Sequence, residues 1–159
     1  MTVLTLKELK AALPAGKRLI GIDHGSKTWG LAVSTPTLSM ATPLKTIRRT
    51  KFGDDVKALA AICAEYGVAG FVIGLPLNMD GSEGPRVDSV RHFALNLEKA
   101  ADALGFTPLI AFFDERLSTH AADDVMLSFD VSRQKRAAAI DMIAAQHILQ
   151  GALDKMVRG

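Results

Sequence analysis

Two short apolar runs on either side of a glycine-containing turn form the clearest pattern in the first part of the chain. The runs cover residues 19–22 and 31–33, and the segment between them contains Gly25 and Gly30. This pattern predicts a β-hairpin over about residues 17–35. Asp23 lies at the end of the first predicted strand, where the backbone turns back. A carboxylate in this place suits a divalent metal ion or a phosphate group, so the function depends on which residues the fold brings beside it.

The rest of the chain alternates between helical and strand-like spacing. Thr5 and Glu8 match a capping box, which predicts a short helix within an N-terminal extension of residues 1–16. A third strand is predicted near residues 43–49, and compact apolar runs predict two more at residues 68–74 and 107–113. Helical periodicity predicts helices over about residues 53–67, 85–105 and 135–157, with another after Ser118 or Thr119 and a loop over residues 128–134.

This order of elements predicts an α/β fold. Three consecutive strands with short connections indicate an antiparallel meander, and strand–helix–strand units form right-handed parallel crossovers. We therefore expect a mixed five-stranded sheet, with three antiparallel strands followed by two parallel ones and helices on both faces, in one domain spanning residues 1–159. Sites in such sheets form at the carboxyl ends of the parallel strands. Asp23 ends the first strand, and Asp114 and Glu115 end the fifth, so these acids should share one edge.

A third acidic position lies on the last predicted helix. Asp141 shares a face with Ala144, Ala145 and Ile148, where a charge is costly unless it is paired or bound to a metal ion. The alternative is an acid in the first turns of the helix, favoured by the helix dipole and still in contact with water. Three acids without a cysteine cluster or a histidine pair favour Mg²⁺ or Mn²⁺. Two such ions about 4 Å apart promote phosphodiester hydrolysis.

Composition and charge exclude several other classes of protein. The chain has 159 residues, of which 48% are hydrophobic and 23% charged, as is usual for a globular protein. The formal net charge of +2 does not by itself indicate a nucleic-acid-binding protein. We predict no membrane-spanning segment and, because the N-terminus lacks a secretory pattern, a cytoplasmic location. The single cysteine, Cys63, excludes an internal disulfide and a cysteine zinc cluster.

Five segments together resemble one known protein family. They are residues 21–25 (Gly-Ile-Asp-His-Gly), 30–34, 72–85, 113–119 and 140–145, and the resemblance covers roughly residues 17–152. The loop Gly-Leu-Pro-Leu-Asn-Met-Asp-Gly-Ser-Glu-Gly within the third segment is its most specific part. The pattern is similar to the YqgF family, bacterial nucleases resembling Holliday junction resolvases in the RNase H-like superfamily. That family is also proposed to process the 5′ end of pre-16S ribosomal RNA.

The resemblance implies an RNase H-like fold, with Asp23, Glu115 and Asp141 as catalytic residues and ligands of two Mg²⁺ or Mn²⁺ ions. Asp114 is adjacent, but successive strand residues point in opposite directions, so only one of the pair should face the site. The family pattern favours Glu115. The chain departs from that pattern at Thr28 and Trp29, which stand where a basic and an aliphatic residue are usual. Trp29 either packs in the hairpin or stacks on a base.

The predicted nucleic-acid contacts lie in the segments near these acids. Asn78, Ser82 and nearby backbone amides are placed to bind phosphate at the start of the helix that begins at Pro85. A solvent-exposed turn is the alternative. The basic candidates for contacts with the nucleic-acid backbone are Lys27, Arg86 and Arg116.

The resemblance predicts a metal-dependent nuclease in ribosome biogenesis that processes precursor ribosomal RNA, in contact with the ribosome or a pre-ribosomal particle. A resolvase of four-way DNA junctions is the alternative, and it requires a homodimer, whereas ribosomal RNA processing is compatible with a monomer. A non-catalytic nucleic-acid-binding protein and a phosphotransfer domain of the sugar-kinase and actin type are further alternatives. Clustered acids disfavour pure binding to a polyanion, and the phosphotransfer architecture has two lobes where 159 residues supply one.

Overall fold

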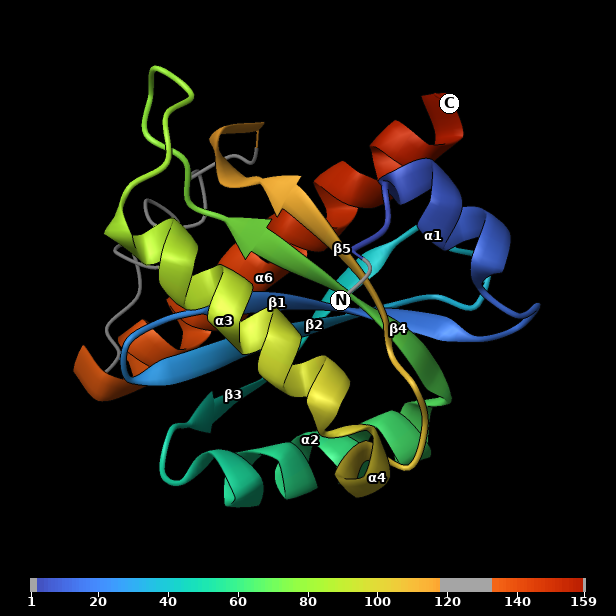
Figure 1. Ribbon diagram of the computed structural model, residues 1–159, viewed down its shortest axis with the longest axis horizontal. Coiled ribbons are helices and arrows are strands. Elements are labelled where there is room, and N and C mark those ends of the chain that lie inside the picture. Colours follow the sequence, from blue (N-terminus) through green and yellow to red (C-terminus); the bar gives the residue numbers. More distant parts are fainter. Residues whose placement is uncertain (1–2, 118–132, 159) are drawn as a thin grey trace.

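A five-stranded mixed sheet forms the centre of the protein (Figure 1). The computed structural model describes residues 3–117 and 133–158. The strands are β1 (Arg18–His24), β2 (Thr28–Ser34), β3 (Ala41–Arg48), β4 (Val68–Leu75) and β5 (Leu109–Asp114), in the order β3-β2-β1-β4-β5. Strands β1, β2 and β3 pair antiparallel, whereas β4 and β5 run parallel to β1. The predicted α/β fold with a mixed five-stranded sheet, three antiparallel strands followed by two parallel ones, is therefore confirmed.

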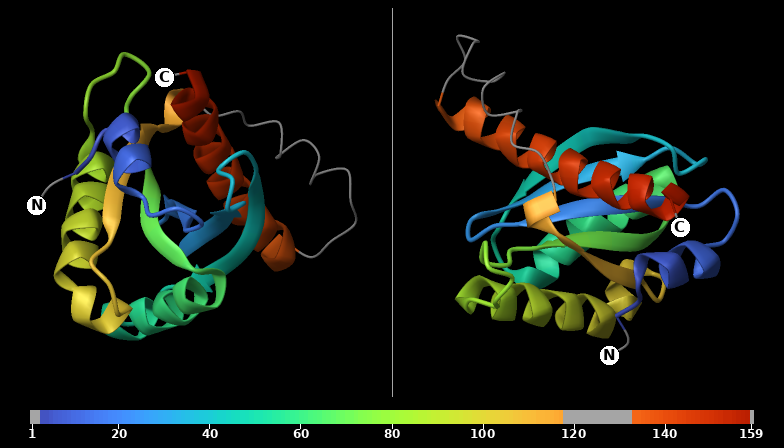
Figure 2. Two further views of the ribbon diagram at one scale, coloured as in Figure 1. Left: turned by 90° about the vertical axis from the view of Figure 1, so that its right-hand side faces the viewer. Right: turned by 90° about the horizontal axis from the view of Figure 1, so that it is seen from above.

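Helices cover both faces of this sheet (Figure 2). The helices α2 (Phe52–Tyr66), α3 (Pro85–Lys99) and α4 (Ala101–Leu104) pack on one face. The long helix α6 (Arg133–Arg158) crosses the other face, and α1 (Leu6–Ala12) packs beside it against β5. A hydrophobic core fills each of the two layers. No helix in the described part of the chain is long and apolar enough to cross a membrane.

Several predicted elements differ in detail from the observed ones. The helix predicted over residues 85–105 is broken at Ala100, whose amide is shared between the carbonyl oxygens of Asn96 and Leu97. The short helix α4 then continues the apolar stripe, so Leu104 is still buried, and the periodicity alone does not reveal the break. The helix predicted after residue 118 and most of the loop predicted over residues 128–134 lie outside the described residues. The last helix already begins at Arg133.

The N-terminal helix forms as its sequence predicts. Thr5 and Glu8 form the predicted capping box: the Thr5 hydroxyl accepts from the Glu8 amide, and the Glu8 carboxylate accepts from the Thr5 amide. Leu4 makes a parallel bridge to Ala111 of β5. Residues that precede the hairpin therefore cover the outer edge of the sheet next to the strand that ends at Asp114.

Candidate functional site

Asp23 and Glu115 form the centre of the candidate site. Asp23 follows Leu19 and Gly21 at steps of two along β1, and both of these face the layer of α6, so Asp23 points to that side. Glu115 is the first residue of the 3₁₀ helix η1 (Glu115–Leu117), which directly follows β5. The two carboxyl groups share a hydrogen bond. The parallel crossovers thus bring together two acids that are 92 residues apart in the sequence.

The ionisation of these two groups is strongly coupled. Burial, followed by the charges of Glu115 and Asp141, raises the pKa of Asp23 from 3.8 to about 7. Burial also raises the pKa of Glu115, while the nearby positive charge of Arg86 acts in the opposite direction on both acids. Two carboxylates at this range oppose each other's ionisation, so the pair keeps a proton to a higher pH than either acid would alone. The site therefore gathers negative charge that a cation can compensate.

Asp141 enters the site from α6. Its carboxylate accepts a hydrogen bond of 2.8 Å from the Thr28 hydroxyl at the start of β2. Its charge contributes to the raised pKa of Asp23. Asp23 is therefore the common neighbour of Glu115 and Asp141, as expected for the three predicted acids. However, no group of three or more His, Cys, Asp or Glu residues within residues 3–117 and 133–158 is arranged to hold a metal ion.

Glycines in the strands let the site elements approach closely. A Cβ on Gly30 of β2 would overlap the backbone carbonyl of Asp141, so only glycine permits α6 to lie at its present distance from the hairpin. A Cβ on Gly74 of β4 would lie 2.6 Å from Oε1 of Glu115. An added Cβ on Gly25, in the hairpin turn, would meet only Thr28, so Gly30 and Gly74 rather than Gly25 make room for these acids.

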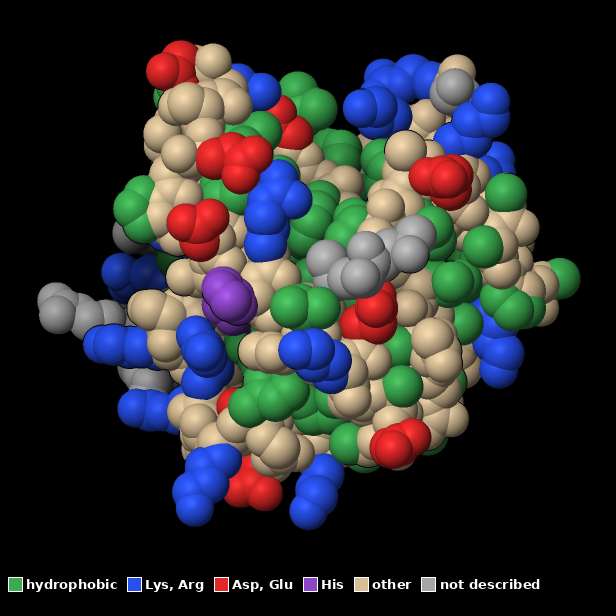
Figure 3. Space-filling model, viewed as in Figure 1, with side chains coloured by type: hydrophobic (Ala, Val, Ile, Leu, Met, Phe, Trp, Pro, Cys, Tyr) green, Lys and Arg blue, Asp and Glu red, His purple; other side chains and the backbone are tan. Residues whose placement is uncertain are grey.

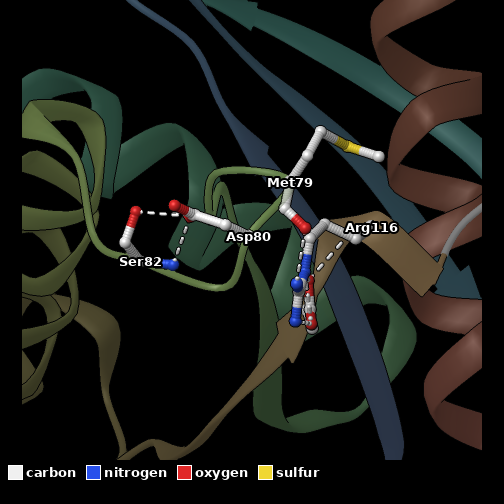
Figure 4. Close-up of polar contacts among 5 residues, drawn as sticks. Met79, Asp80, Ser82 and Arg116 are labelled. Carbon is white, nitrogen blue, oxygen red and sulfur yellow. Dashed lines mark hydrogen bonds and ion pairs between the residues drawn. The ribbon is translucent and has the colours of Figure 1, made fainter.

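Asp114 has a different role from Glu115. The Arg116 guanidinium binds the Asp114 carboxylate through a salt bridge of 2.6 Å, and this contact lowers the pKa of Asp114. Arg116 also donates a hydrogen bond of 3.2 Å to the backbone carbonyl of Met79 (Figure 4). The predicted nucleic-acid contact Arg116 is thus already engaged, linking η1 to the loop between β4 and α3. Of the two adjacent acids, only Glu115 pairs with Asp23, as the family pattern favoured.

The loop over residues 76–84 holds its own polar groups together. The Asn78 side-chain amide donates to the Ser82 hydroxyl over 3.0 Å, and the Ser82 hydroxyl donates to Asp80 over 2.6 Å. The Ser82 amide also donates to Asp80, over 2.9 Å (Figure 4). A phosphate at Ser82 would have to displace the Asp80 carboxylate, which is a constraint that the sequence did not reveal. Asn78 and Ser82 are both exposed at the end of β4.

The two other predicted cationic contacts are exposed. Lys27 lies in the hairpin turn, and its backbone carbonyl accepts from the Arg49 amide over 2.9 Å. Arg86 lies in the first turn of α3, close enough to the acid pair for its charge to lower the pKa of both members. Arg86 is thus the one of the five predicted nucleic-acid contacts whose charge acts directly on the ionisation of Asp23 and Glu115.

The opposite side of the hairpin is a packing surface. Trp29 is 1% exposed, and its ring centroid lies 4.8 Å from that of Phe93. Trp29 therefore packs in the hairpin, and the alternative prediction that it stacks on a base is wrong. His24 packs against the same phenylalanine at 4.4 Å, and burial lowers its pKa to about 4. His24 is therefore neutral at pH 7 and points away from Asp23, its neighbour in β1.

Two residues that support the site were missed by the sequence reasoning. Thr28 was noted only as a departure from the family pattern, but it orients Asp141. Arg49 follows β3, and its guanidinium donates to the carbonyl oxygens of Gly25 and Ser26 over 2.8 and 3.3 Å. The sequence offered only two signals for these roles. One is a hydroxyl residue in a hairpin whose first strand ends in an acid, and the other is an arginine after the third strand.

Two solved structures of Holliday junction resolvases are distantly similar to the chain. Thermus thermophilus RuvC in complex with a Holliday junction substrate is 12% identical, with a TM-score of 0.47 over 88% of this chain and 96% of that one. The yeast mitochondrial Holliday junction resolvase Ydc2 is 10% identical, with a TM-score of 0.49 over 96% and 85% of the two chains.

Sequence relatives are much more similar. A Rhodospirillum centenum protein named "Putative pre-16S rRNA nuclease" is 51% identical over 159 residues, which cover all of this chain and 85% of the relative. A Rhodobacter capsulatus protein of the same name is 54% identical over 152 residues, covering 95% and 92% of the two chains. Residues 17–155 match the family described as "RuvX: Holliday junction resolvase". The predicted YqgF resemblance is thereby confirmed, and the chain belongs to the RuvX (YqgF) family.

Proposed function

We propose that this protein is a metal-dependent nuclease that hydrolyses phosphodiester bonds in structured nucleic acid, and that it processes the 5′ end of precursor 16S ribosomal RNA. The observation that carries the proposal is the position of Asp23, held at the end of β1 between Glu115 and Asp141. Membership of the RuvX family supports the nuclease activity, and the names of the relatives support the ribosomal RNA substrate. The location that follows from this role is the cytoplasm, on precursor ribosomal RNA or a pre-ribosomal particle.

The donor set fits a hard divalent cation. Asp23, Glu115 and Asp141 supply only carboxylate oxygens, which are the ligands that Mg²⁺ and Mn²⁺ prefer. The coupled pair also carries negative charge at short range that a cation would stabilise. We therefore assign these three residues as the ligands of one or two such ions. When bound, the ions supply an activated water and stabilise the leaving oxygen.

The protein's own residues then prepare the site for this chemistry. The Thr28 hydroxyl fixes the Asp141 carboxylate, and Gly30 allows α6 to bring it near Asp23. Arg86 supplies a positive charge beside the acid pair, in reach of an incoming phosphate. The salt bridge of Asp114 with Arg116 ties η1, and with it Glu115, to the end of β5.

The description of the matched family favours a second candidate, the resolution of four-way DNA junctions. A symmetric junction has two equivalent strands to cut, so this activity requires two sites related by a twofold axis, as in a homodimer. Processing of a single RNA end is compatible with a monomer. Substrate choice and oligomeric state together therefore separate the two candidates.

The test compares two substrates under identical conditions. A precursor 16S ribosomal RNA fragment and a four-way DNA junction are each incubated with Mn²⁺ and with wild type, Asp23→Asn or the exposed control Asp102→Asn. We expect wild type and Asp102→Asn to cleave the RNA and Asp23→Asn to lose at least 100-fold in rate, because an active-site carboxylate is removed. Equal cleavage by wild type and Asp23→Asn contradicts the proposed mechanism, and cleavage of the junction alone reverses the choice of substrate.

A further inference from the structure

A pocket of about 740 Å³ lies beside the candidate site, between α1, the end of β5 and the last turns of α6. Its walls carry Lys7 and Lys10 from α1 and Lys155 from α6, and its floor is formed by Phe112, Phe113 and Leu117. Figure 3 shows basic side chains gathered over α1 and the C-terminal end of α6, next to a hollow with hydrophobic side chains at its base. We call this hollow the lysine pocket.

The charge of the lysine pocket is positive. All three lysines are exposed. Asp114 is the only acid that lines the pocket among the described residues, and its carboxylate is held by Arg116. Lys155 lies near enough to Asp114 to lower the pKa of that carboxyl. The three lysines therefore attract an anion, and the negative charge of Asp114 is already neutralised by Arg116.

The floor of the lysine pocket is apolar and open. Leu117 is 59% exposed, so its side chain is accessible at the surface of the pocket that it lines. Phe112 is partly exposed on the α3 side of β5, where Arg91 lies over its ring, and Phe113 is buried on the α6 side. A volume of this size is within the range that holds a small organic group such as a nucleobase with its sugar.

The lysine pocket is continuous with the acid pair through η1. Glu115, the first residue of this short helix, bonds to Asp23, and Leu117, its last residue, lines the pocket. One turn of backbone therefore joins the two places.

We propose that the lysine pocket binds unpaired nucleotides of the substrate strand that continue beyond the cleaved bond. The bases rest on the apolar floor, and the phosphates contact Lys7, Lys10 and Lys155. This combination of a basic groove and an apolar base-binding surface is the usual means of holding a single strand without reading its sequence. The inference rests on the proposed function, since it extends the same substrate from the acid pair into a second subsite.

The test measures binding without cleavage, in the Asp23→Asn background. Fluorescence anisotropy follows the affinity for an RNA duplex with a single-stranded extension and for the same duplex with blunt ends, between 50 mM and 300 mM salt. The variant carries Lys7→Gln, Lys10→Gln and Lys155→Gln together. The control carries Lys17→Gln, Lys57→Gln and Lys99→Gln, which remove equal charge from exposed positions that do not line the lysine pocket.

We expect the parent to prefer the extended duplex and the pocket variant to lose that preference. Three lost phosphate contacts lower the slope of log affinity against log salt by about 2, which corresponds to at most about 100-fold at 0.1 M salt. The single change Leu117→Ala should reduce the preference about fivefold without altering the slope, because it removes apolar contact and no charge. The control should retain both the preference and the slope. An arm with a DNA extension shows whether the pocket distinguishes RNA from DNA.

The inference is overturned if the pocket variant, folded by its melting temperature, keeps the parent's preference for the extended duplex, or loses equal affinity for both duplexes. An unchanged preference would mean that the pocket holds a different occupant, such as an acidic protein segment. An equal loss of affinity for both duplexes would mean that the lysines attract any nucleic acid through their charge alone. Cleavage by wild type separates this outcome from failure of the proposed function. If wild type cleaves and the preference is unchanged, only the pocket assignment fails, whereas absence of any cleavage contradicts the proposed function itself.

Discussion

Replacing Asp23 by asparagine should stabilise the metal-free protein at high pH while abolishing its proposed activity. The carboxyl group is partly buried and bonded to Glu115, with Asp141 nearby, and these neighbours raise its pKa from 3.8 to about 7. An acid with a raised pKa retains its proton in the folded state at pH values where the unfolded chain has released it. The contribution of Asp23 to the free energy of unfolding of wild type therefore falls as the pH rises from about 4 to about 7, and then stays level.

The magnitude follows from the size of the shift. A rise of about 3 pKa units corresponds to about 4 kcal/mol at 1.36 kcal/mol per unit, which is an upper limit. Water reaches part of the side chain, and the proton is shared with Glu115, so we expect about 2 kcal/mol. Asparagine carries no charge and cannot show this decline. The stability of Asp23→Asn relative to wild type should consequently increase by about 2 kcal/mol between pH 4 and pH 8.

Urea unfolding in EDTA, followed by circular dichroism at pH 4, 5, 6, 7 and 8, measures this difference. Taking the difference between variant and wild type at each pH removes the contributions of the titrating groups that do not interact with Asp23. Asp102→Asn, an exposed acid in the first turn of α4, serves as the control and should follow wild type at every pH. If the Asp23→Asn and wild-type curves run parallel across this range, the carboxyl cluster does not oppose ionisation, and the electrostatic description of the site is wrong.

The remaining predictions concern the geometry around the acids and the metal ion. Gly30→Ala should destabilise the protein by about 1–3 kcal/mol, because the added Cβ pushes Asp141 and its helix away, whereas Gly53→Ala, with open space around its Cα, should change urea stability by less than about 1 kcal/mol. Thr28→Val should lower kcat about tenfold with KM unchanged, because it removes the hydroxyl that donates to Asp141, and Thr28→Ser should keep the wild-type kcat. Equal rates for both variants would contradict this positioning role. Mg²⁺ at 100 times its Kd should raise the free energy of unfolding of wild type by about 2.7 kcal/mol and leave Asp23→Asn unaffected in thermal melts; an equal rise in both would place the ion elsewhere.

The sequence by itself determined the order and direction of the elements and the identity of the acids. The apolar runs around the hairpin placed Asp23 at a strand end, and the strand–helix–strand pattern placed Glu115 at the same edge of the sheet. The family pattern chose Glu115 over Asp114. These conclusions depend on local periodicity and on the handedness of crossovers, both of which are encoded in short stretches of chain. The catalytic role of the three acids stays a prediction until it is tested.

Only the tertiary structure decided the contacts between elements. The hydrogen bond from Thr28 to Asp141 joins residues that are 113 positions apart. The need for glycine at Gly30 arises from how closely α6 approaches β2. Arg116, whose contact with nucleic acid stays a prediction, forms a salt bridge with Asp114. Periodicity reports which face of its own element a residue occupies, whereas these contacts depend on the distance and angle between packed elements, which are set by the packing of the whole core.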